Sequence, residues 1–597
     1  MQYLFLCAIG PVQDFIATAR RSRDLWYGSW MLSELSKAAA RELAQQFGAD
    51  NLIFPAPEKL KYLEPGSDLG VANKIVAVID ADPAKVGQRV ESAVKKRLKT
   101  LRDAALNKVE RLDGNLDSRT LAENQIDDLL EFYWVTASLA AEDDYSSVRD
   151  TTEALMAARK NTRDFRQSKG ANKLKSSLDG NRESVIPKME YAQRGDSGRE
   201  RERKANALYR HYRARPGERL SGVDLLKRLG EPEKKGSNAP KFYSTSHFAA
   251  LPFMQMLDDK HSIKADVFLN EIYNAYKSVD WIVPSISNDG SLLYESRLSD
   301  SIPAGDVLKS LQEKLKGIFE DHKVSKRPSP YYALLRADGD NMGLIIDGQK
   351  SQKDHRKVSQ SLSEFALEVP KIVEAEEYQG KVIYAGGDDI LAYLPLHTVL
   401  KCAAELDERF QEQMGKFKGK DKNGKEVSPS LSAGIVIAHH LTPLADVLAM
   451  SKNAERKGKD IKGKNALVIV LSKRSGADRE IAGKWGPLNI RLQKMIKLHR
   501  KKAISKGTAY ELQKLNRDFA EANISIEVVN KEALRIIKRK RESGSDKKIG
   551  DYVIKQFEEW LKKVPLYDLA QEMIVANIFA TAQDMAGVKL PVEKEEI

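Results

Sequence analysis

Between residues 331 and 470, short apolar runs alternate with segments whose apolar residues recur every three or four positions. The first pattern predicts buried strands and the second predicts amphipathic helices. The predicted strands are 331–338, the two arms of a hairpin at 381–394, 431–438 and 466–470. The predicted helices follow the stripes Val358/Leu362/Phe365/Val369, Val399/Ala403/Leu406/Phe410 and Leu444/Val447/Leu448. The first part has the order β-α-β-β-α-β of the ferredoxin-like fold, which polymerase and cyclase palms share.

The first 140 residues repeat part of this pattern. The stretch "YLFLCAIG" (3–10) aligns without a gap on "YALLRADG" (332–339), and two further strand-like runs follow it. In this alignment Ile9 takes the place of Asp338. The sequence therefore predicts an N-terminal second palm that has lost an acidic residue, although a match over eight residues also arises by chance.

The remaining segments are polar or helical in pattern. Between residues 150 and 245, "RQSKGANKLKSSLDGNRES" (166–184) and "RGDSGRERERKANA" (194–207) predict loops. Residues 245–325 are mostly helical in pattern, and only helices are predicted after 476. The predicted fold class is α+β, with two ferredoxin-like palm domains and two helical domains. The predicted boundaries are a degenerate first palm at 1–220, a helical domain at 221–327, a second palm at 328–475 and a C-terminal helical bundle at 476–597.

Acidic residues stand where two strands of the second palm end. The hairpin turn Gly386-Gly387-Asp388-Asp389 carries two carboxylates, and the first strand ends at Asp338. In the ferredoxin-like order these strands are neighbours, so the carboxylates are predicted to meet at one edge of the sheet. Mg²⁺ takes carboxylate and phosphate oxygens, and Mn²⁺ is the alternative ion. The sequence therefore predicts a two-metal nucleotidyl-transfer site. The alternatives are a plain glycine-rich turn and a strand-end cap, and Asp340 in particular fits a turn.

Further residues are candidates for contact with a nucleotide. The list comprises Gly339, Gly386, Gly387, Ser432, Ala433, Gly434, Lys457 and Lys459. Glycine permits close backbone approach, a small residue and a hydroxyl on the 431–438 strand suit a purine, and a lysine suits a triphosphate. Core packing is the alternative for the strand residues, and a solvated helix end is the alternative for the lysines. His439 and His440 have no acidic partner in the sequence nearby and are predicted to be structural.

Composition adds a basic balance and little cysteine. The chain has 98 Lys and Arg against 85 Asp and Glu, a net charge of +13. That balance suits nucleic acid, phosphates or an acidic partner, and Arg20, Arg21, Arg23 and the run 538–541 are possible contacts or solvated faces. Cys7 and Cys402 cannot form a disulfide framework. No apolar run is long enough for a membrane span and no signal peptide is evident, so a cytoplasmic protein is expected.

Six long blocks occur in a fixed order along the first 475 residues. They are "IGPVQDFIATARRSRDLWYGSWMLSEL" (9–35), "FYSTSHFAALPF" (242–253), "LLRADGDNMG" (334–343), "YAGGDDILAYLP" (384–395), "LSAGIVIAHHLTPL" (431–444) and "KNALVIVLSKRSG" (464–476). Together they resemble the large palm-domain subunit of type III-B (Cmr) CRISPR effector complexes. The resemblance implies two cyclase-like palms and a metal-binding, catalytic role for Asp338, Asp388 and Asp389.

The resemblance also implies a function. The subunit would assemble with other Cmr subunits, CRISPR RNA and target RNA. The second palm would then convert ATP into a cyclic oligoadenylate or a related AMP-containing second messenger. Many relatives begin with an HD nuclease domain, but this sequence starts at the first palm and has no histidine before His211, so HD-type DNA cleavage is not expected. Some relatives carry a four-cysteine zinc site, which two cysteines cannot form, so no structural zinc is expected.

Two other functions stay open at this point. One is a catalytically silent scaffold subunit that binds the RNA complex through its basic surface. The other is a stand-alone nucleotide cyclase of the GGDEF type, which would need neither RNA nor partners. The sequence leaves open the product, its ring size and whether ATP is joined to a different acceptor.

Overall fold

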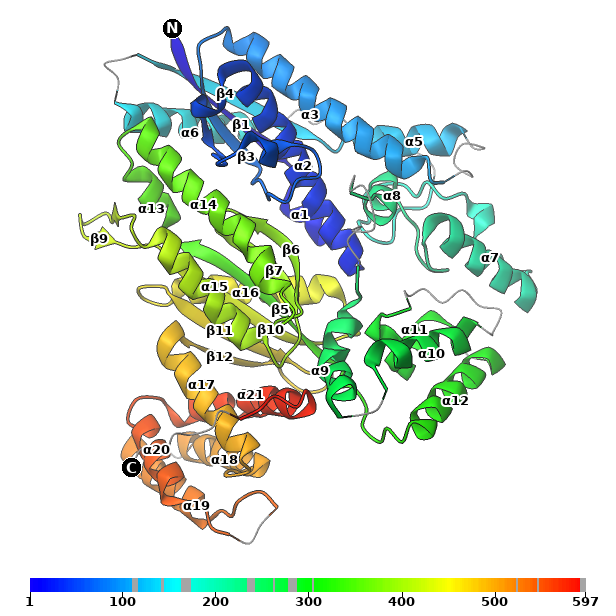
Figure 1. Cartoon of the computed structure of the whole chain (residues 1–597), viewed down its shortest axis with the longest axis vertical. Helices are drawn as coiled ribbons and strands as arrows, with labels where there is room; N and C mark the ends of the chain where they lie inside the picture. Colours follow the sequence, from blue (N-terminus) through cyan, green and yellow to red (C-terminus); the bar gives the residue numbers. More distant parts are fainter. Residues whose placement is uncertain are drawn as a thin grey trace.

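The computed structural model describes residues 1–109, 116–140, 144–162, 173–232, 242–260, 263–277, 287–302, 305–521, 524–544 and 547–590. Part of the loop predicted at 166–184 lies outside these residues. Two large sheets lie one above the other in Figure 1, and the helices that follow the second sheet lie at the opposite end of the molecule from the first. The predicted α+β fold class is confirmed.

The N-terminal sheet is built as a ferredoxin-like palm. Its elements are β1 (Gln2–Gly10), α1 (Gln13–Ala17), α2 (Ser22–Phe47), β2 (Leu52–Phe54), β3 (Lys74–Ile79), α3 (Pro83–Leu106), α5 (Leu116–Asp127), β4 (Glu131–Leu139) and α6 (Tyr145–Asn161). The antiparallel strands have the order β2-β3-β1-β4. Successive side chains of a strand point to opposite faces, so Phe5 and Cys7 pack with α2 and α3, whereas Leu4 and Leu6 pack with α6.

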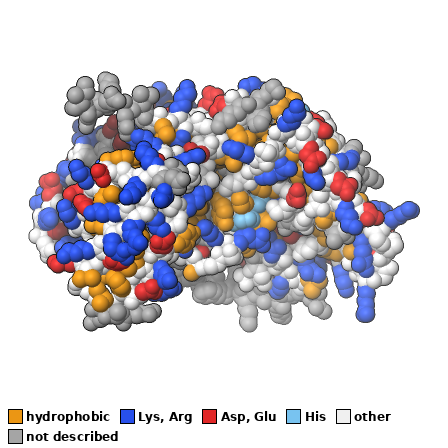
Figure 2. Space-filling model, turned by 90° about the horizontal axis from the view of Figure 1, so that it is seen from below, with side chains coloured by type: hydrophobic (Ala, Val, Ile, Leu, Met, Phe, Trp, Pro, Cys, Tyr) orange, Lys and Arg blue, Asp and Glu red, His pale blue; other side chains and the backbone are white. Residues whose placement is uncertain are grey.

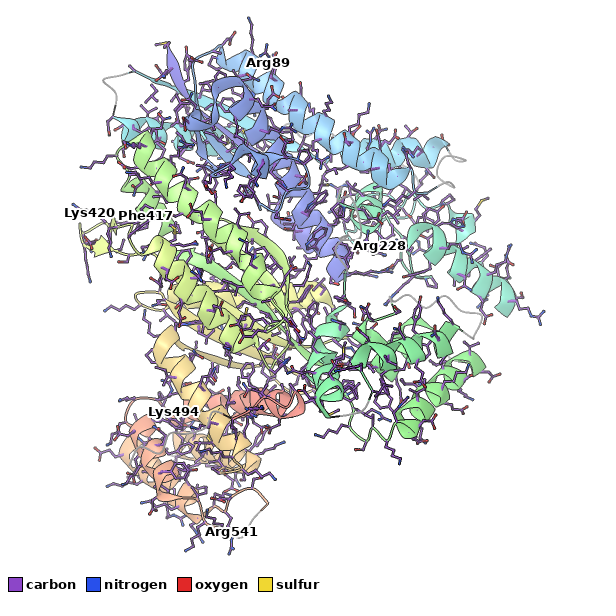
Figure 3. All side chains as sticks on the ribbon, viewed as in Figure 1. Arg89, Arg228, Phe417, Lys420, Lys494 and Arg541 are labelled. Carbon is purple, nitrogen blue, oxygen red and sulfur yellow. The ribbon has the colours of Figure 1, made fainter. Side chains whose placement is uncertain are left out.

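The second sheet has the same order with two strands added. Its elements are β5 (Tyr331–Asp340), α13 (Met342–Asp347), α14 (Gln352–Val373), β6 (Lys381–Gly386), β7 (Asp389–Leu394), α15 (Val399–Met414), β8 (Gly419–Lys420), β9 (Glu426–Val427), β10 (Ser430–His439), α16 (Leu444–Asp460), β11 (Ala466–Ser472) and β12 (Arg479–Lys484). The strand order is β12-β11-β10-β5-β7-β6. Ala333 and Leu335 pack with α14 and α15 on one face, and Tyr332 and Leu334 pack on the face that α9 and α16 cover. The small β8–β9 hairpin, which carries Phe417 and Lys420 at its base and in its first strand, projects from the edge of the sheet in Figure 3.

The two palms contact each other in a reciprocal way. Helix α2 of the first palm packs on β6 of the second, and α14 of the second packs on β2 of the first. Polar contacts join the same two bodies, since Arg149 on α6 donates to the carbonyl of Ile346 at 2.6 Å and pairs with Asp347 at 3.0 Å. The Tyr145 hydroxyl lies 2.8 Å from Nδ1 of His355 on α14. The matching strand orders and the reciprocal contacts support the internal repeat that the sequence indicates.

Outside the two sheets, the described residues form further helices joined by turns and loops. They are α7 (Gly198–Tyr212), α8 (Gly222–Leu229), α9 (Thr245–Lys260), α10 (Ala265–Lys277), α11 (Glu295–Ser301), α12 (Asp306–Asp321), α17 (Trp485–Arg500), α18 (Lys506–Glu521), α19 (Ile526–Arg539), α20 (Asp551–Leu561) and α21 (Leu566–Met585). Among the described residues, no helix is long and apolar enough to cross a bilayer.

Two predictions of local structure are wrong. The segment 194–207 was expected to be a loop, but most of it lies in α7, because Ser197 accepts a hydrogen bond from the amide of Glu200 and caps the helix. Only helices were expected after 476, but 479–484 form strand β12, which pairs with β11 through Ala482 and Ile481. An edge strand of mixed polarity lacks a clear apolar alternation, so its pairing with β11 determines its structure.

Candidate active site

The predicted carboxylates lie at one end of the second sheet. Strand β5 pairs with β7 up to Ala337 and Ile390, so Asp338 and Asp389 follow at the end of this ladder. The hairpin residue Asp388 lies directly against β5, since a Cβ atom added to Gly339 would meet the Asp388 Cβ at 2.7 Å. The structure therefore brings Asp338, Asp388 and Asp389 to neighbouring positions where β5 ends and β7 begins. We call this end of the sheet the carboxylate edge.

Asp338 takes part in a network of alternating charges. Its carboxylate accepts a hydrogen bond from the Lys459 ammonium at the end of α16. Lys459 lies 3.3 Å from Glu455 one helical turn earlier, and Arg336 donates to Glu455 at 2.6 Å. Arg336 and Asp338 are two residues apart on β5 and so share a face of the sheet. Lys459 is therefore within reach of the carboxylate edge, as its prediction as a phosphate-binding residue requires.

The hairpin carboxylates titrate near neutral pH. Burial raises the pKa of Asp388 to about 7, and the neighbouring Asp389 carboxylate adds to this rise. Burial also raises the pKa of Asp389 to about 6, against the opposing effect of the Arg336 guanidinium. The surrounding protein thus disfavours two bare negative charges in the turn, and a bound cation would favour them.

The carboxylate oxygens are suitable ligands for a hard divalent cation, but the side chains are not arranged to hold one. Oxygen donors of this kind are the ligands of Mg²⁺ and Mn²⁺. However, among the described residues no group of three His, Cys, Asp or Glu side chains converges closely enough to hold a metal ion. The predicted three-carboxylate ligand set is therefore not assembled in this conformation, because Asp338 is bonded to Lys459 and Asp388 packs over Gly339.

The predicted nucleotide-contacting glycines differ in their surroundings. Gly387 has a φ of +74° and open space around the position of a Cβ atom, so the turn needs glycine and leaves room beside it. A Cβ atom on Gly386 would meet the Tyr384 hydroxyl at 2.1 Å. Gly339 is likewise covered by Asp388. Of these three, Gly387 is the one with open space in the direction of a Cβ atom, and contact with a nucleotide stays a prediction for all three.

The β10 residues predicted to contact a purine are structural in this conformation. Ser432 is fully buried, and its hydroxyl donates to the Asp340 carboxylate at 2.7 Å. Ala433 is buried in the core. A Cβ atom on Gly434 would meet α16 at Ala454 at 2.9 Å, so this glycine lets the helix approach the strand. The core-packing alternative therefore holds for all three residues.

Asp340 stabilises the end of β5 through hydrogen bonds. It is 1 % exposed and accepts hydrogen bonds from the hydroxyl of Ser430 at 2.7 Å and the amide of Asn465 at 2.9 Å, besides that of Ser432. These bonds tie the end of β5 to β10 and to the start of β11. Asp340 therefore holds the strand that presents Asp338, instead of closing a turn.

The other sequence candidates lie away from the carboxylates. Lys457 pairs with Glu480 on β12 at 2.6 Å, three strands from β5 in the sheet order. The ring of His440 bonds Ser246 at 2.8 Å, at the far end of β10. Lys457 thus fits the solvated-helix alternative, and the His440 ring has a structural partner in Ser246.

A contact from the first palm completes the edge and was not predicted. A Cβ atom on Gly70 would lie 1.8 Å from the carbonyl oxygen of Ala385, next to the hairpin turn. The loop that carries Gly70 is held by buried charges, because the amide of Gly66 donates to Glu34 at 3.1 Å and Lys37 donates to the carbonyl of Ser67 at 3.0 Å. No local sequence signal indicates this contact. By contrast, Arg336 stands two residues before Asp338 on β5 and Glu455 stands four residues before Lys459 on α16. This spacing places each of them on the same side of its element as the site residue, so the sequence does indicate both.

Comparisons with known proteins agree with the predicted resemblance. Residues 331–468 match the model of the second palm domain of Cas10/Cmr2, and residues 4–103 match that of the N-terminal domain of the CRISPR-associated protein Cmr2. In these two regions the chain is similar to the Cas10/Cmr2 family. It is 26 % identical over 555 residues to the CRISPR system Cmr subunit Cmr2 of Pyrococcus furiosus, covering 79 % of this chain and 61 % of that protein. The chain thus spans less than two thirds of the length of this curated relative.

Solved structures show the same fold as this chain. A chain of the type III-B Cmr-beta complex in the apo state matches with a TM-score of 0.63 at 16 % identity, over 98 % of this chain and 82 % of that one. A chain of Cmr-beta bound to cognate target RNA matches with a TM-score of 0.64 at 16 % identity, over 97 % and 83 %. At this identity the likeness establishes the fold of the chain.

Proposed function

We propose that the chain is the signalling subunit of a type III CRISPR complex and that its second palm is a divalent-metal-dependent nucleotidyltransferase that uses ATP. The observation that carries the proposal is the placement of Asp338, Asp388 and Asp389 at one edge of a palm of the Cas10/Cmr2 family. The named relatives support assembly with other Cmr subunits, CRISPR RNA and target RNA.

In the proposed reaction, the 3′-hydroxyl of one adenosine nucleotide attacks the α-phosphate of another ATP. A bond forms between O3′ and that phosphorus, the bond to the β-phosphate oxygen breaks, and pyrophosphate leaves. Repetition and ring closure yield a cyclic oligoadenylate, or a related messenger where the acceptor differs. When bound, Mg²⁺ or Mn²⁺ would neutralise phosphate oxygens and spread the charge of the transition state.

The chain's own residues have separate parts in this reaction. Asp338, Asp388 and Asp389 would hold the cations. Burial raises the pKa values of Asp388 and Asp389, so these two carboxyl groups would lose protons as a cation binds. Lys459 would exchange its bond to Asp338 for one to a phosphate oxygen, while Glu455 keeps the ammonium close to the edge. The open side of Gly387 is where the backbone admits a nucleotide.

The test compares the wild-type chain with Asp388→Ala/Asp389→Ala, each assembled with its partner subunits and guide RNA and supplied with labelled ATP and Mg²⁺. We expect adenylate-containing products only when target RNA is present and only from the wild type. The double variant Glu558→Ala/Glu559→Ala on α20 carries the same change in charge far from the palm and should retain activity.

Two outcomes would favour the alternatives. The scaffold function would be supported if the wild type and the variants assemble equally into the complex and none of them forms a product. This must hold both with ATP alone and with cell extract as a source of other acceptors. Product formation by the isolated chain without RNA would support the stand-alone cyclase. Mass spectrometry of the product identifies its ring size and acceptor.

A further inference from the structure

Side chains at the carboxylate edge form two cross-strand rows on one face of the second sheet. Residues that lie opposite each other on paired strands point to the same face, so the register of the four strands determines both rows. The row at the edge comprises Gly386, Asp389, Asp338 and Ser432, and the row behind it comprises Tyr384, Leu391, Arg336 and Gly434. Because its first member is glycine, the edge row has no side chain of its own on β6.

The hydroxyl of Tyr384 lies in the place that Gly386 leaves empty. A Cβ atom added to Gly386 would lie 2.1 Å from the Tyr384 hydroxyl oxygen and 2.4 Å from the ring atom Cζ. The tyrosine side chain therefore runs along its own strand toward the hairpin turn, and glycine at 386 leaves the room for it. Since Gly386 is the cross-strand neighbour of Asp389, this arrangement brings the hydroxyl beside that carboxylate.

The Tyr384 hydroxyl is available to a ligand. The side chain is half-buried, and its ring packs against the apolar cluster on the face that α9 and α16 cover. Within the described ranges of the chain, no protein group forms a hydrogen bond with this hydroxyl. Burial and the charges of Asp389 and Asp388 raise the pKa of Tyr384, so the phenol keeps its proton and can donate it in a hydrogen bond.

The two sides of the carboxylate pair differ in charge. Lys459 of α16 donates to Asp338 from the side of β10, on which α16 packs. Tyr384 is uncharged and stands on β6, two strands from β5 in the sheet order. Two strand spacings amount to about 10 Å, so one nucleoside triphosphate is long enough to contact both residues. An ammonium group suits the charged triphosphate, which leaves the neutral hydroxyl to the sugar.

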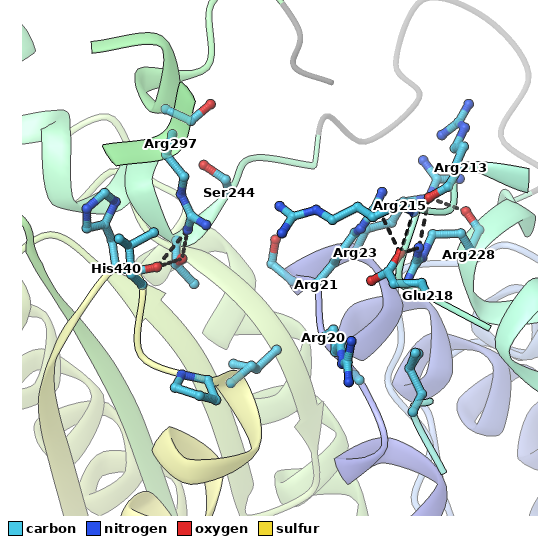
Figure 4. A pocket seen from close by; sticks show the side chains of 18 of the residues that line it. Arg20, Arg21, Arg23, Arg213, Arg215, Glu218, Arg228, Ser244, Arg297 and His440 are labelled. Carbon is cyan, nitrogen blue, oxygen red and sulfur yellow. Dashed lines mark hydrogen bonds and ion pairs between the residues drawn. The ribbon is translucent and has the colours of Figure 1, made fainter. Parts of the chain in front are cut away.

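A large cavity elsewhere in the molecule does not compete for this nucleotide. It has a volume of about 1640 Å³ and is lined by His440, which follows the end of β10 remote from Asp338. Figure 2 shows a hollow near the middle of one face, with lysine and arginine side chains spread around it. In Figure 4, Arg297 and Arg21 face this cavity from opposite sides. Both are engaged by protein groups, since Arg21 pairs with Glu218 at 3.3 Å and Arg297 donates to Ser246 at 2.6 Å.

We propose that the Tyr384 hydroxyl binds a ribose hydroxyl of the nucleotide at the carboxylate edge and makes the second palm select ribonucleotides over deoxynucleotides. This inference rests on the proposed nucleotidyl transfer and names the group that recognises the sugar. A ribose hydroxyl can accept a hydrogen bond from the phenol while it donates one to a carboxylate such as Asp389. A deoxy analogue leaves these polar groups without their partner and should therefore bind more weakly.

The test is calorimetry of the full chain with Mg²⁺ and without target RNA, using ATP, 2′-deoxy-ATP and 3′-deoxy-ATP as ligands. We expect the wild type to bind ATP about tenfold more tightly than one of the two analogues, which identifies the ribose hydroxyl that is bound. Tyr384→Phe should bind ATP only as tightly as the wild type binds that analogue, and its affinity for the analogue should be unchanged. The matched control Tyr552→Phe removes a hydroxyl from an exposed ring on α20 and should keep the preference for ATP.

A purely structural role of Tyr384 gives a different result. In that case Tyr384→Phe would weaken the binding of all three nucleotides equally, and the proposal would be wrong. Equal affinity of the wild type for the three nucleotides, an unchanged preference in Tyr384→Phe or a lost preference in the control would also overturn it. Urea unfolding of Tyr384→Phe should match the wild type, because the hydroxyl has no protein partner in the described residues.

Failure of this inference can be told apart from failure of the proposed function. If the wild type binds ATP and Tyr384→Phe selects ATP equally well, the inference about the sugar is wrong and the nucleotidyl-transfer proposal stands. If the wild type binds no ATP, either as the isolated chain or in the complex assembled with target RNA, both proposals are wrong.

Discussion

Replacing Gly70 by alanine tests whether the first palm sets the position of the hairpin that carries Asp388 and Asp389. The Cβ atom of the new residue would lie 1.8 Å from the Ala385 carbonyl oxygen, whereas real contacts of this kind are not closer than 3.0 Å, so the two backbones have to separate by about 1.2 Å. Gly70 does not have a positive φ, so the effect is steric and not one of backbone strain. Neither contact atom belongs to a flexible side chain that can turn away.

The expected size of the effect follows from this geometry. Overpacking a well-packed site costs about 1–3 kcal/mol. Since Ala385 stands three residues before Asp388, part of the separation should move the hairpin itself. A displacement of about 1 Å at a reacting centre lowers rates by about 10²-fold. Gly70→Ala should therefore lose about 1–3 kcal/mol of unfolding free energy and, in the assembled complex, most of its nucleotidyl transfer.

Two measurements check this prediction. Urea unfolding gives the stability, and hydrogen exchange of residues 381–394 reports the hairpin. Gly317→Ala on α12 is the matched control, because its Cβ atom would meet nothing within 4 Å, and it should gain up to about 1 kcal/mol from helix propensity. Wild-type stability and unchanged hairpin exchange in Gly70→Ala would refute the reasoning.

Two further predictions concern Glu218 and Lys459. Burial alone would raise the pKa of Glu218, but Arg228 and Arg21 outweigh it and lower the pKa to about 2. The resulting stability is present above the unfolded pKa of about 4.5 and is lost as pH falls toward 2. Glu218→Gln should therefore cost about 3 kcal/mol at pH 7 and progressively less below pH 4.5 in urea unfolding; a pH-independent difference would contradict this. Lys459→Ala should weaken ATP binding at least tenfold by calorimetry, whereas Lys457→Ala should not, and equal effects would place the triphosphate elsewhere.

The second palm and its carboxylate edge are predictable from sequence for a physical reason. Strands β5 and β10 are buried on both faces, so their apolar runs stand out between polar turns, and the helices between them have complete apolar stripes. Once the strand order is known, Asp338 and the hairpin must meet. Local pattern and overall topology agree here, as they do in most stable folds.

The details of the edge depend on contacts that local pattern does not contain. A serine on a buried strand can face a ligand or a carboxylate, and only the structure shows that Ser432 bonds Asp340. A lysine at a helix end can reach the site or a neighbouring strand, as Lys459 and Lys457 do. Strand β12 forms through pairing with β11, without an alternation of its own. These choices depend on distances of a few ångströms between segments far apart in the chain.

The asymmetry between the two palms suggests what the first one contributes. Both palms have the same strand order, and α2 packs on β6 while α14 packs on β2. However, the buried, apolar Ile9 of the first palm takes the place of Asp338 in the second. A buried isoleucine cannot hold a cation, so at this position the first palm supplies packing and no ligand. Its loop instead reaches the second hairpin at Gly70, over a buried network of Glu34 and Lys37. The first palm therefore acts on the carboxylate edge through position, and Gly70→Ala is the substitution that tests this role.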